Sequence, residues 1–466
     1  MRPEIKEYNF DWLIWRSLDP ASKLSNGSAK ELEQVYRYVP YFKGVLKGIL
    51  DTGRVGASFL KMLNQYFEDL MTAREKGKKI AMITFSFSPT ILQAMDVVPV
   101  TMELLSAFSG MMWKRGAYDY LDHAVQVGLT ETACSAQRGA MGAYLSGLGE
   151  EVDFIICNMP GSCDTNATAF AFAAAYLDKP FMQLCYPATL GDDRSERYHV
   201  EDFKEVISFV KDQTGKILDE DRLRCILEEV KKQDEMVAEL EDMMRLKPSP
   251  VPGIFNIFNY GGRFLCHGRK EYTDVLADML EAARENLTSG HSGLSSGEEK
   301  LRALLCYIDH YTLDVNFFNW LDRRGISHMG NVLSRHFPKH ICYSEGLSPF
   351  DVDTTDLDTM LESIAQMNAR APMPRMVRGP YDGPNQWLDE SLGLAKMFSV
   401  DCLIYAGTPG CRNTWGMIKP FARDIEKQGY PVHIMYSDAF DDRMESWENT
   451  SERLDEFFTI RGLLRM

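Results

Sequence analysis

Two stretches of sequence, VDFIICNMPGSC (residues 152–163) and VDCLIYAGTPGC (residues 400–411), decide the fold. Each contains an apolar strand-like run, a Pro-Gly turn and a cysteine, in that order. The offset between them is 248 residues at the first valine (400 − 152) and again at the final cysteine (411 − 163). After each copy come a helical stretch and a further strand that opens with Pro180 or Pro431. Chance matches a short apolar strand easily, but rarely strand, turn and cysteine together. We therefore predict two Rossmann-like domains related by duplication or convergence.

The surrounding sequence extends this prediction to an α/β fold. Near-continuous apolar runs separated by helix-length segments are typical of a parallel sheet that is covered on both faces. Such runs occupy residues 79–85, 97–102, 180–185, 340–343 and 431–436. Helical periodicity marks residues 29–76, with Ser28 as a candidate N-cap, and again 200–245 and 271–286. The predicted organisation is a helical N-terminal segment (1–75), a Rossmann-like domain (76–199), a helical connecting region (200–299) and a second Rossmann-like domain (300–466).

Composition limits the classes of function. The 51 basic and 67 acidic residues give a net charge of −16, which argues against nucleic-acid binding and against docking on an anionic membrane. No signal peptide opens the chain, and no apolar run reaches the ~20 residues of a membrane helix. Ten cysteines among 466 residues are too dilute for a disulfide scaffold, so we expect a cytoplasmic protein with reduced thiols. No P-loop and no Gly-x-Gly-x-x-Gly motif after a strand is present, so we expect neither ATP hydrolysis nor NAD binding by this chain.

Three cysteines occupy positions that differ from those of ordinary core cysteines. Cys163 and Cys411 each follow the carboxyl end of a predicted strand, where open α/β sheets form their ligand sites. Cys134 opens a predicted helix, and a thiolate at a helix N-terminus is stabilised by the dipole and the free N–H groups. Their wide spacing resembles neither a zinc ribbon nor a ferredoxin. From the residues alone, a thiolate ligand set and a purely structural role both stay open.

The remaining cysteines are predicted to be structural. Cys157, Cys185 and Cys402 lie inside predicted strands, and we expect all three in the core. The same is expected of Cys225 and Cys306, which lie on predicted helices, and structural roles are the default for Cys266 and Cys342.

The setting of Cys134, Cys163 and Cys411 resembles the family of 2-hydroxyacyl-CoA dehydratases and ATP-dependent benzoyl-CoA reductases. The resemblance rests on Cys134-Ser-Ala-Gln-Arg138 at a helix start, Cys163-Asp164 after a strand, and Gly410-Cys411-Arg412 after a C-terminal strand. It extends from about residue 70 to the C-terminus. The N-terminal segment carries no motif that matches the family.

The resemblance implies a 4Fe–4S cluster held by Cys134, Cys163 and Cys411, with one iron open to substrate. It further implies an oxygen-sensitive lyase that works as a heterodimer with a homologous second subunit and receives electrons from an ATP-hydrolysing iron–sulfur activator protein. Such an enzyme eliminates water from an (R)-2-hydroxyacyl-CoA through a ketyl radical and gives the enoyl-CoA. Two alternatives stay open: a reductase of aromatic acyl-CoA, and an electron-relay or scaffold subunit without a substrate site of its own.

The resemblance also suggests catalytic roles for Ser86 and Glu103, which match a Ser and a Glu near the open iron. Both follow predicted strands at the expected end of the sheet. Alternatively, Ser86 caps the helix after Pro89, and Glu103 caps a helix or pairs on the surface.

Elsewhere in the sequence, His310 and His340 are expected to be core or surface residues. The aromatic and Gly/Pro-rich loop at 375–387 is equally consistent with a wall of the acyl-CoA pocket, a subunit interface or ordinary packing.

Overall fold

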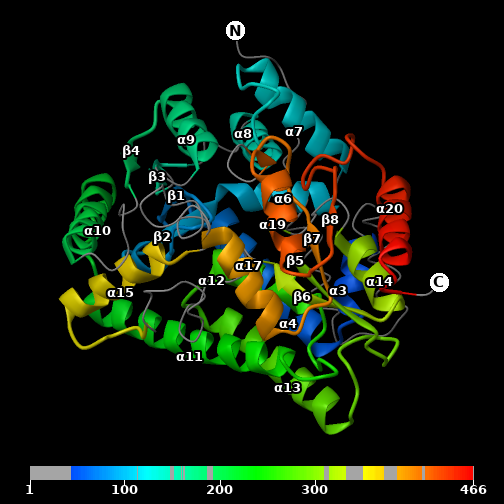
Figure 1. Cartoon of the computed structure of the whole chain (residues 1–466). Helices are drawn as coiled ribbons and strands as arrows, with labels where there is room; N and C mark the ends of the chain where they lie inside the picture. Colours follow the sequence, from blue (N-terminus) through cyan, green and yellow to red (C-terminus); the bar gives the residue numbers. More distant parts are fainter. Residues whose placement is uncertain are drawn as a thin grey trace.

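Two four-stranded parallel sheets organise the chain, in a computed structural model that describes residues 43–112, 114–146, 152–158, 160, 163–185, 193–308, 314–331, 350–371, 386–411 and 415–464. The first sheet has the order β2-β1-β3-β4 and the second the order β6-β5-β7-β8. Figure 1 shows them on opposite sides of the centre of the molecule. The strands of the first sheet are β1 (Lys79–Ile83), β2 (Val97–Thr101), β3 (Phe154–Cys157) and β4 (Phe181–Gln183). Those of the second sheet are β5 (Leu301–Leu305), β6 (Ile326–Asn331), β7 (Cys402–Tyr405) and β8 (Val432–Ile434). The predicted fold class is confirmed.

The two sheets repeat one topology. Strand β7 begins 248 residues after β3 (402 − 154) and also ends 248 residues after it (405 − 157). Each of these strands lies between the first strand of its sheet and an edge strand, β4 or β8, that is preceded by a proline. The matched order of all four strands agrees with the relation by duplication or convergence that the two opening stretches predict.

Side-chain alternation along the strands divides the core into three parts. In β1, Ile80 and Met82 join a cluster that also contains Leu304, Leu403 and Tyr405 of the second sheet, so the inner faces share one core. The outer face of the first sheet packs against α5, α10, α11 and α15, and that of the second sheet against α14 and α20. Strands buried on both faces explain why the sequence runs are almost continuously apolar.

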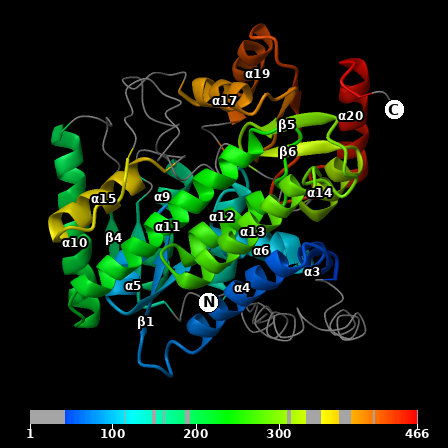
Figure 2. The same ribbon diagram turned by 90° about the horizontal axis from the view of Figure 1, so that it is seen from below.

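Helices cover both faces of each sheet and fill the space between them. Helices α11 and α13 lie in the lower part of Figure 1, and Figure 2, seen from below, shows them side by side across the underside of the molecule. Helix α4 packs against α13, so the segment from residue 43 onward belongs to the shared core. The bounds of the helices are α3 (Lys43–Leu50), α4 (Arg54–Met71), α5 (Thr90–Ala94), α6 (Met102–Met112), α7 (Lys114–Gln126), α8 (Ser135–Leu145), α9 (Asp164–Leu177), α10 (Asp193–Thr214), α11 (Glu220–Met244), α12 (Phe255–Cys266), α13 (Lys270–Thr288), α14 (Asp314–Arg323), α15 (Leu357–Ala369), α17 (Gln386–Met397), α19 (Ile418–Lys427) and α20 (Trp447–Ile460).

Two strands, β5 and β6, were not predicted. Both are fully buried along their length, although each carries polar side chains such as Arg302 and His328. The predicted helix at 200–245 is two helices, α10 and α11, separated at Gly215, which has a positive φ of 71°. Among the residues that the structure describes, no helix is both long and apolar enough to cross a membrane. Ser28, His310, His340, Cys342 and the strand predicted at 340–343 lie outside the described residues.

Candidate functional site: a cavity lined by three cysteines

Helix starts and a strand end supply the three cysteines. Cys134 is the N-cap of α8 and Cys163 is the N-cap of α9, which follows β3. Cys411 follows β7 in a turn in which its N–H bonds to the carbonyl of Thr408 at 2.9 Å. Both predicted settings, the helix start and the carboxyl end of a parallel strand, are therefore present.

The fold brings these three positions together although they come from different halves of the chain. A Cβ built on Gly410 would lie 2.6 Å from the carbonyl oxygen of Ala133 and 2.8 Å from the Cα of Cys134. The main chain before Cys411 therefore touches the main chain at Cys134, and only glycine allows this approach. Tyr307, which follows β5, places its hydroxyl 3.4 Å from the Sγ of Cys411.

All three cysteines line one cavity of about 70 Å³. It lies at the carboxyl ends of the strands, which is the expected location in parallel sheets. Its wall also includes Glu103 and Gln137. Aromatic side chains form much of the remaining lining, namely Phe85, Tyr260, Phe264, Tyr307 and Phe440.

Electrostatic interactions among the three cysteines affect the pKa of Cys134 and Cys163. Burial raises the pKa of the Cys134 thiol, and electrostatic repulsion from the neighbouring Cys411 raises it further. For Cys163, burial is again the main cause of a raised pKa, followed by the charges of Cys411 and Cys134. Backbone N–H groups at the starts of α8 and α9 oppose these shifts, including those of Gln137 and Asn166. Three buried thiols that repel one another as thiolates favour a positively charged occupant.

Three thiols in one cavity are a donor set that could hold a metal-containing group. A single metal ion holds its thiolates at about 2.3 Å and so draws their sulfurs close together. Within the described part of the chain, no three His, Cys, Asp or Glu side chains are close enough to bind one ion. A cluster distributes its ligands over several irons, and cysteine thiolates are its usual ligands. Three convergent thiols with helix N–H groups aimed at two of them fit such a group.

Glu103 is a buried carboxyl group on the wall of this cavity. It lies in the first turn of α6, accepts a hydrogen bond from the backbone N–H of Phe85 at 3.1 Å, and is bonded by the amide groups of Gln137 and Asn166. Burial raises its pKa to about 7 against the opposing effect of these donors. A carboxyl group of this pKa can both give and accept a proton near neutral pH. Glu103 is buried and so does not pair on the surface, but its carboxyl group also accepts from its own backbone N–H in the first turn of α6, so the helix-cap alternative stays open.

Ser86 lies at the same end of the first sheet but does not belong to the described lining of the cavity. It is buried, and its hydroxyl donates to Oδ1 of Asn158 at 3.1 Å. The N-cap residue of α5 is Pro89, three residues after Ser86. Its catalytic role stays a prediction.

The other cysteines divide into core and surface residues. Cys157, Cys266, Cys306 and Cys402 are buried in the core, as expected. The prediction of core positions for Cys185 and Cys225 is wrong, because both are exposed. Cys185 lies beyond the end of the short strand β4, and Cys225 lies on the solvent side of α11. Cys306 follows β5 and does not lie on a helix.

Of the loop at 375–387, the structure describes residues 386 and 387, and the Trp387 side chain makes ordinary packing contacts. Trp387 stacks on Phe421 with ring centroids 4.4 Å apart, and its indole N–H donates to the carbonyl of Cys306 at 2.8 Å. Residues 375–385 lie outside the described residues, so the acyl-CoA and interface interpretations stay predictions.

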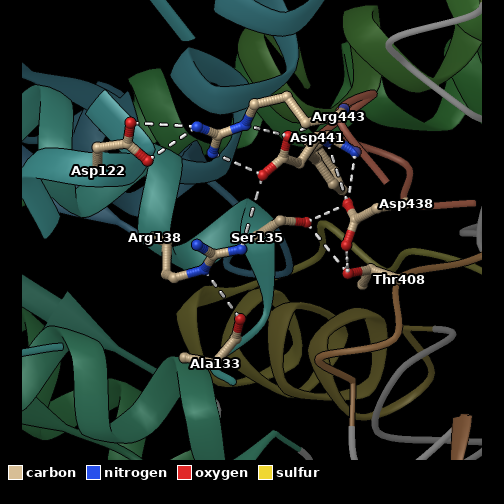
Figure 3. A network of polar contacts seen from close by, with 9 residues as sticks. Asp122, Ala133, Ser135, Arg138, Thr408, Asp438, Asp441 and Arg443 are labelled. Atoms are coloured by element: carbon tan, nitrogen blue, oxygen red, sulfur yellow. Dashed lines mark hydrogen bonds and ion pairs between the residues drawn. The ribbon is translucent and has the colours of Figure 1, made fainter. Parts of the chain in front are cut away.

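Several residues around the cysteines were not predicted from the sequence to belong to the site. Gln137 and Asn166 each lie three positions after a cysteine, so the signal was a shared Cys-x-x-amide spacing at two helix starts. Tyr307 was not identified as a site residue, because the strand that precedes it, β5, was not predicted from the sequence. Figure 3 shows a further network, in which Ser135, the residue after Cys134 in the sequence, meets Thr408 and Asp438.

A family model matches most of the chain. The model described as 2-hydroxyglutaryl-CoA dehydratase, D-component, matches residues 84–460 of the 466 in this chain. The match spans Glu103 and all three cavity cysteines. A comparison with curated proteins finds no match. Because the matched region covers most of the chain, the protein belongs to the family of the 2-hydroxyglutaryl-CoA dehydratase D-component.

Proposed function

We propose that this chain is an iron–sulfur subunit of a 2-hydroxyacyl-CoA dehydratase, with Cys134, Cys163 and Cys411 as the ligands of a 4Fe–4S cluster. The observation that carries the proposal is the convergence of these three cysteines in one cavity that also contains Glu103. A cluster held by Cys134, Cys163 and Cys411 would supply one-electron reduction, which a ketyl radical requires, and Lewis-acid chemistry in this cavity. The substrate is an (R)-2-hydroxyacyl-CoA and the product is the enoyl-CoA.

The chain's own residues would prepare the cavity for this chemistry. The starts of α8 and α9 direct backbone N–H groups at Cys134 and Cys163, which stabilises the thiolate form. The aromatic part of the wall limits the water that reaches the reacting atoms. Glu103, with a pKa of about 7, holds or releases a proton beside the departing hydroxyl group.

The proposal includes an assembly. The chain would pair with a homologous second subunit and draw electrons from an ATP-hydrolysing iron–sulfur activator protein. The composition fits this division of work, because the sequence contains no P-loop with which this chain would hydrolyse ATP itself.

Reconstitution without oxygen tests the proposal. The complex of this chain, a homologous partner, the activator, ATP and a strong reductant should convert 2-hydroxyacyl-CoA substrates to enoyl-CoA. Omission of the partner or the activator should abolish turnover, and this chain alone with NADH should be inactive. Turnover by the chain alone would overturn the proposal. Reduction of benzoyl-CoA without any dehydration would replace it by the reductase alternative.

A further inference from the structure

The carboxyl group of Asp438 lies next to the thiol cavity but has no part in the chemistry proposed above. It follows β8, in the second half of the chain, and its side chain is buried. Ser135 and Thr408, which contact it, are also buried. Figure 3 shows the three side chains meeting between α8 and the loops that follow β7 and β8.

Asp438 joins the two chain segments that carry Cys134 and Cys411. Its Oδ1 accepts from the hydroxyl of Ser135, the residue after Cys134, and its Oδ2 accepts from the hydroxyl of Thr408 at 2.6 Å. Thr408 in turn accepts the backbone N–H of Cys411 through its carbonyl at 2.9 Å. The two cysteines are therefore linked through one carboxylate, although they come from opposite halves of the chain.

Burial raises the pKa of Asp438, and the hydrogen bonds that its carboxyl group accepts oppose that shift. Besides the two hydroxyl groups, the backbone N–H groups of Phe440 and Asp441 donate to Oδ1 at 2.9 and 3.2 Å. A carboxylate only accepts hydrogen bonds, and four donors stabilise its negative charge. That charge is close enough to Cys134 to disfavour a thiolate there.

A second layer of charged residues holds this arrangement from outside. Arg138, one helical turn after Cys134, donates to the carbonyl of Ala133 at 3.1 Å and lies 4.0 Å from Asp441. Arg443 bonds both to Asp441 and, across to α7, to Asp122. The loop that carries Asp438 is thus fastened to the helix pair α7 and α8.

We propose that Asp438 is a positioning residue that fixes Cys134 relative to Cys411 and whose negative charge makes the cluster bound between them harder to reduce. This inference rests on the proposed function, since it concerns the cluster that these cysteines would hold. Ser135 and Thr408 hold the two cysteine-bearing segments in place through their hydrogen bonds to the carboxylate of Asp438.

Two substitutions at this position separate charge from geometry. Asp438→Asn retains an oxygen that accepts from Ser135 and from the two backbone N–H groups, and its amide nitrogen can donate to the oxygen of Thr408. It should keep the full iron content while the midpoint potential of the cluster rises. Asp438→Ala removes the link itself, and should accelerate loss of iron to a chelator by about tenfold, which corresponds to one lost net hydrogen-bonding interaction of about 1.4 kcal/mol.

Asp442→Asn is the matched control. Asp442 lies in the same loop and bonds to the hydroxyl of Tyr118, but none of its described hydrogen bonds goes to Ser135 or Thr408. This variant removes a charge of the same sign and should change the potential less than Asp438→Asn, and should leave the rate of iron loss unchanged.

The experiment uses the full chain purified without oxygen, with redox titration followed by electron paramagnetic resonance and chelator-dependent bleaching on the same samples. A potential for Asp438→Asn equal to that of wild type, together with wild-type iron loss in Asp438→Ala, would overturn the inference while leaving the proposed function intact. Absence of a cluster in the wild-type chain would overturn the proposed function instead.

Discussion

The Glu103→Gln variant tests whether the carboxyl group of Glu103 is catalytic or only structural. Gln preserves the shape of the side chain and most of its hydrogen bonds to Phe85, Gln137 and Asn166, but it cannot exchange a proton. General acid–base assistance contributes about 10²–10⁴-fold to a rate. We therefore expect the variant to keep its cluster and fold while the dehydration rate falls at least about 100-fold.

The same substitution should stabilise the fold at alkaline pH. The pKa of Glu103 rises from 4.5 to about 7 on folding, so the folded state retains the proton more strongly than the unfolded state. The stability of the wild type should therefore fall as pH rises from about 4.5 through about 7, by about 3 kcal/mol in total. Gln cannot ionise and so avoids this loss of stability. However, its amide N–H₂ group faces one of the three hydrogen-bond donors, and the lost hydrogen bond lowers the stability by about 1 kcal/mol. The net effect of Glu103→Gln is a gain of about 2 kcal/mol at pH 8 and a loss of about 1 kcal/mol at pH 4.

Two assays on each sample test this prediction. Dehydration rate in the reconstituted complex is measured together with iron content, and urea unfolding of the iron-free chain is measured at pH 4 and pH 8 after circular dichroism has shown that it stays folded. Glu241→Gln, a buried carboxyl in α11 that is not among the cavity-lining residues, serves as control and should leave the rate unchanged. A near-normal rate with a full cluster in Glu103→Gln would refute the catalytic role and favour an electron-relay subunit.

Three further substitutions test other parts of the structure. Gly410→Ala should cripple cluster binding without unfolding the chain, because its Cβ would lie 2.6 Å from the carbonyl oxygen of Ala133; iron content and circular dichroism measure this, and a full cluster would contradict the close approach. Tyr307→Phe should keep the cluster but lower its midpoint potential, since a hydrogen bond to the sulfur of Cys411 is lost; redox titration measures the shift, and an unchanged potential would argue against that bond. Arg302→Met should destabilise the fold by about 3–5 kcal/mol, because it leaves Glu299 without its ion-pair partner and the carbonyl of Phe398 without its hydrogen-bond donor. Urea unfolding measures this, and a loss below about 1 kcal/mol would contradict it.

The sequence predicted those parts of the fold in which apolar patterning and turn residues agree. Strands β3 and β7 were recognised because each combines a continuous apolar run with a Pro-Gly turn. Strand β5 was not recognised because Arg302 interrupts its apolar pattern. The guanidinium of Arg302 is satisfied by Glu299, three residues earlier, and by the backbone carbonyls of residues 244, 246 and 398. No local pattern reveals these carbonyls, because they lie far away in the sequence.

The candidate site could be predicted only in part for the same reason. The three cysteines stood out because each follows a strand or opens a helix. Their convergence depends on the packing of the two halves, which sequence spacing does not encode. Asp438 gave no signal, since an acidic residue after a strand is common and its importance comes from Ser135, 303 residues away in the chain.

Iron and acid-labile sulfide content of the chain, purified without oxygen, tests the central claim most directly. The wild type should contain about four irons and four sulfides per chain. Cys411→Ala should lose most of both, whereas Cys402→Ala, which alters a buried cysteine on the other face of the neighbouring strand β7, should retain the wild-type amount. Equal loss of iron from Cys411→Ala and Cys402→Ala, or a wild-type chain without iron, would contradict the account.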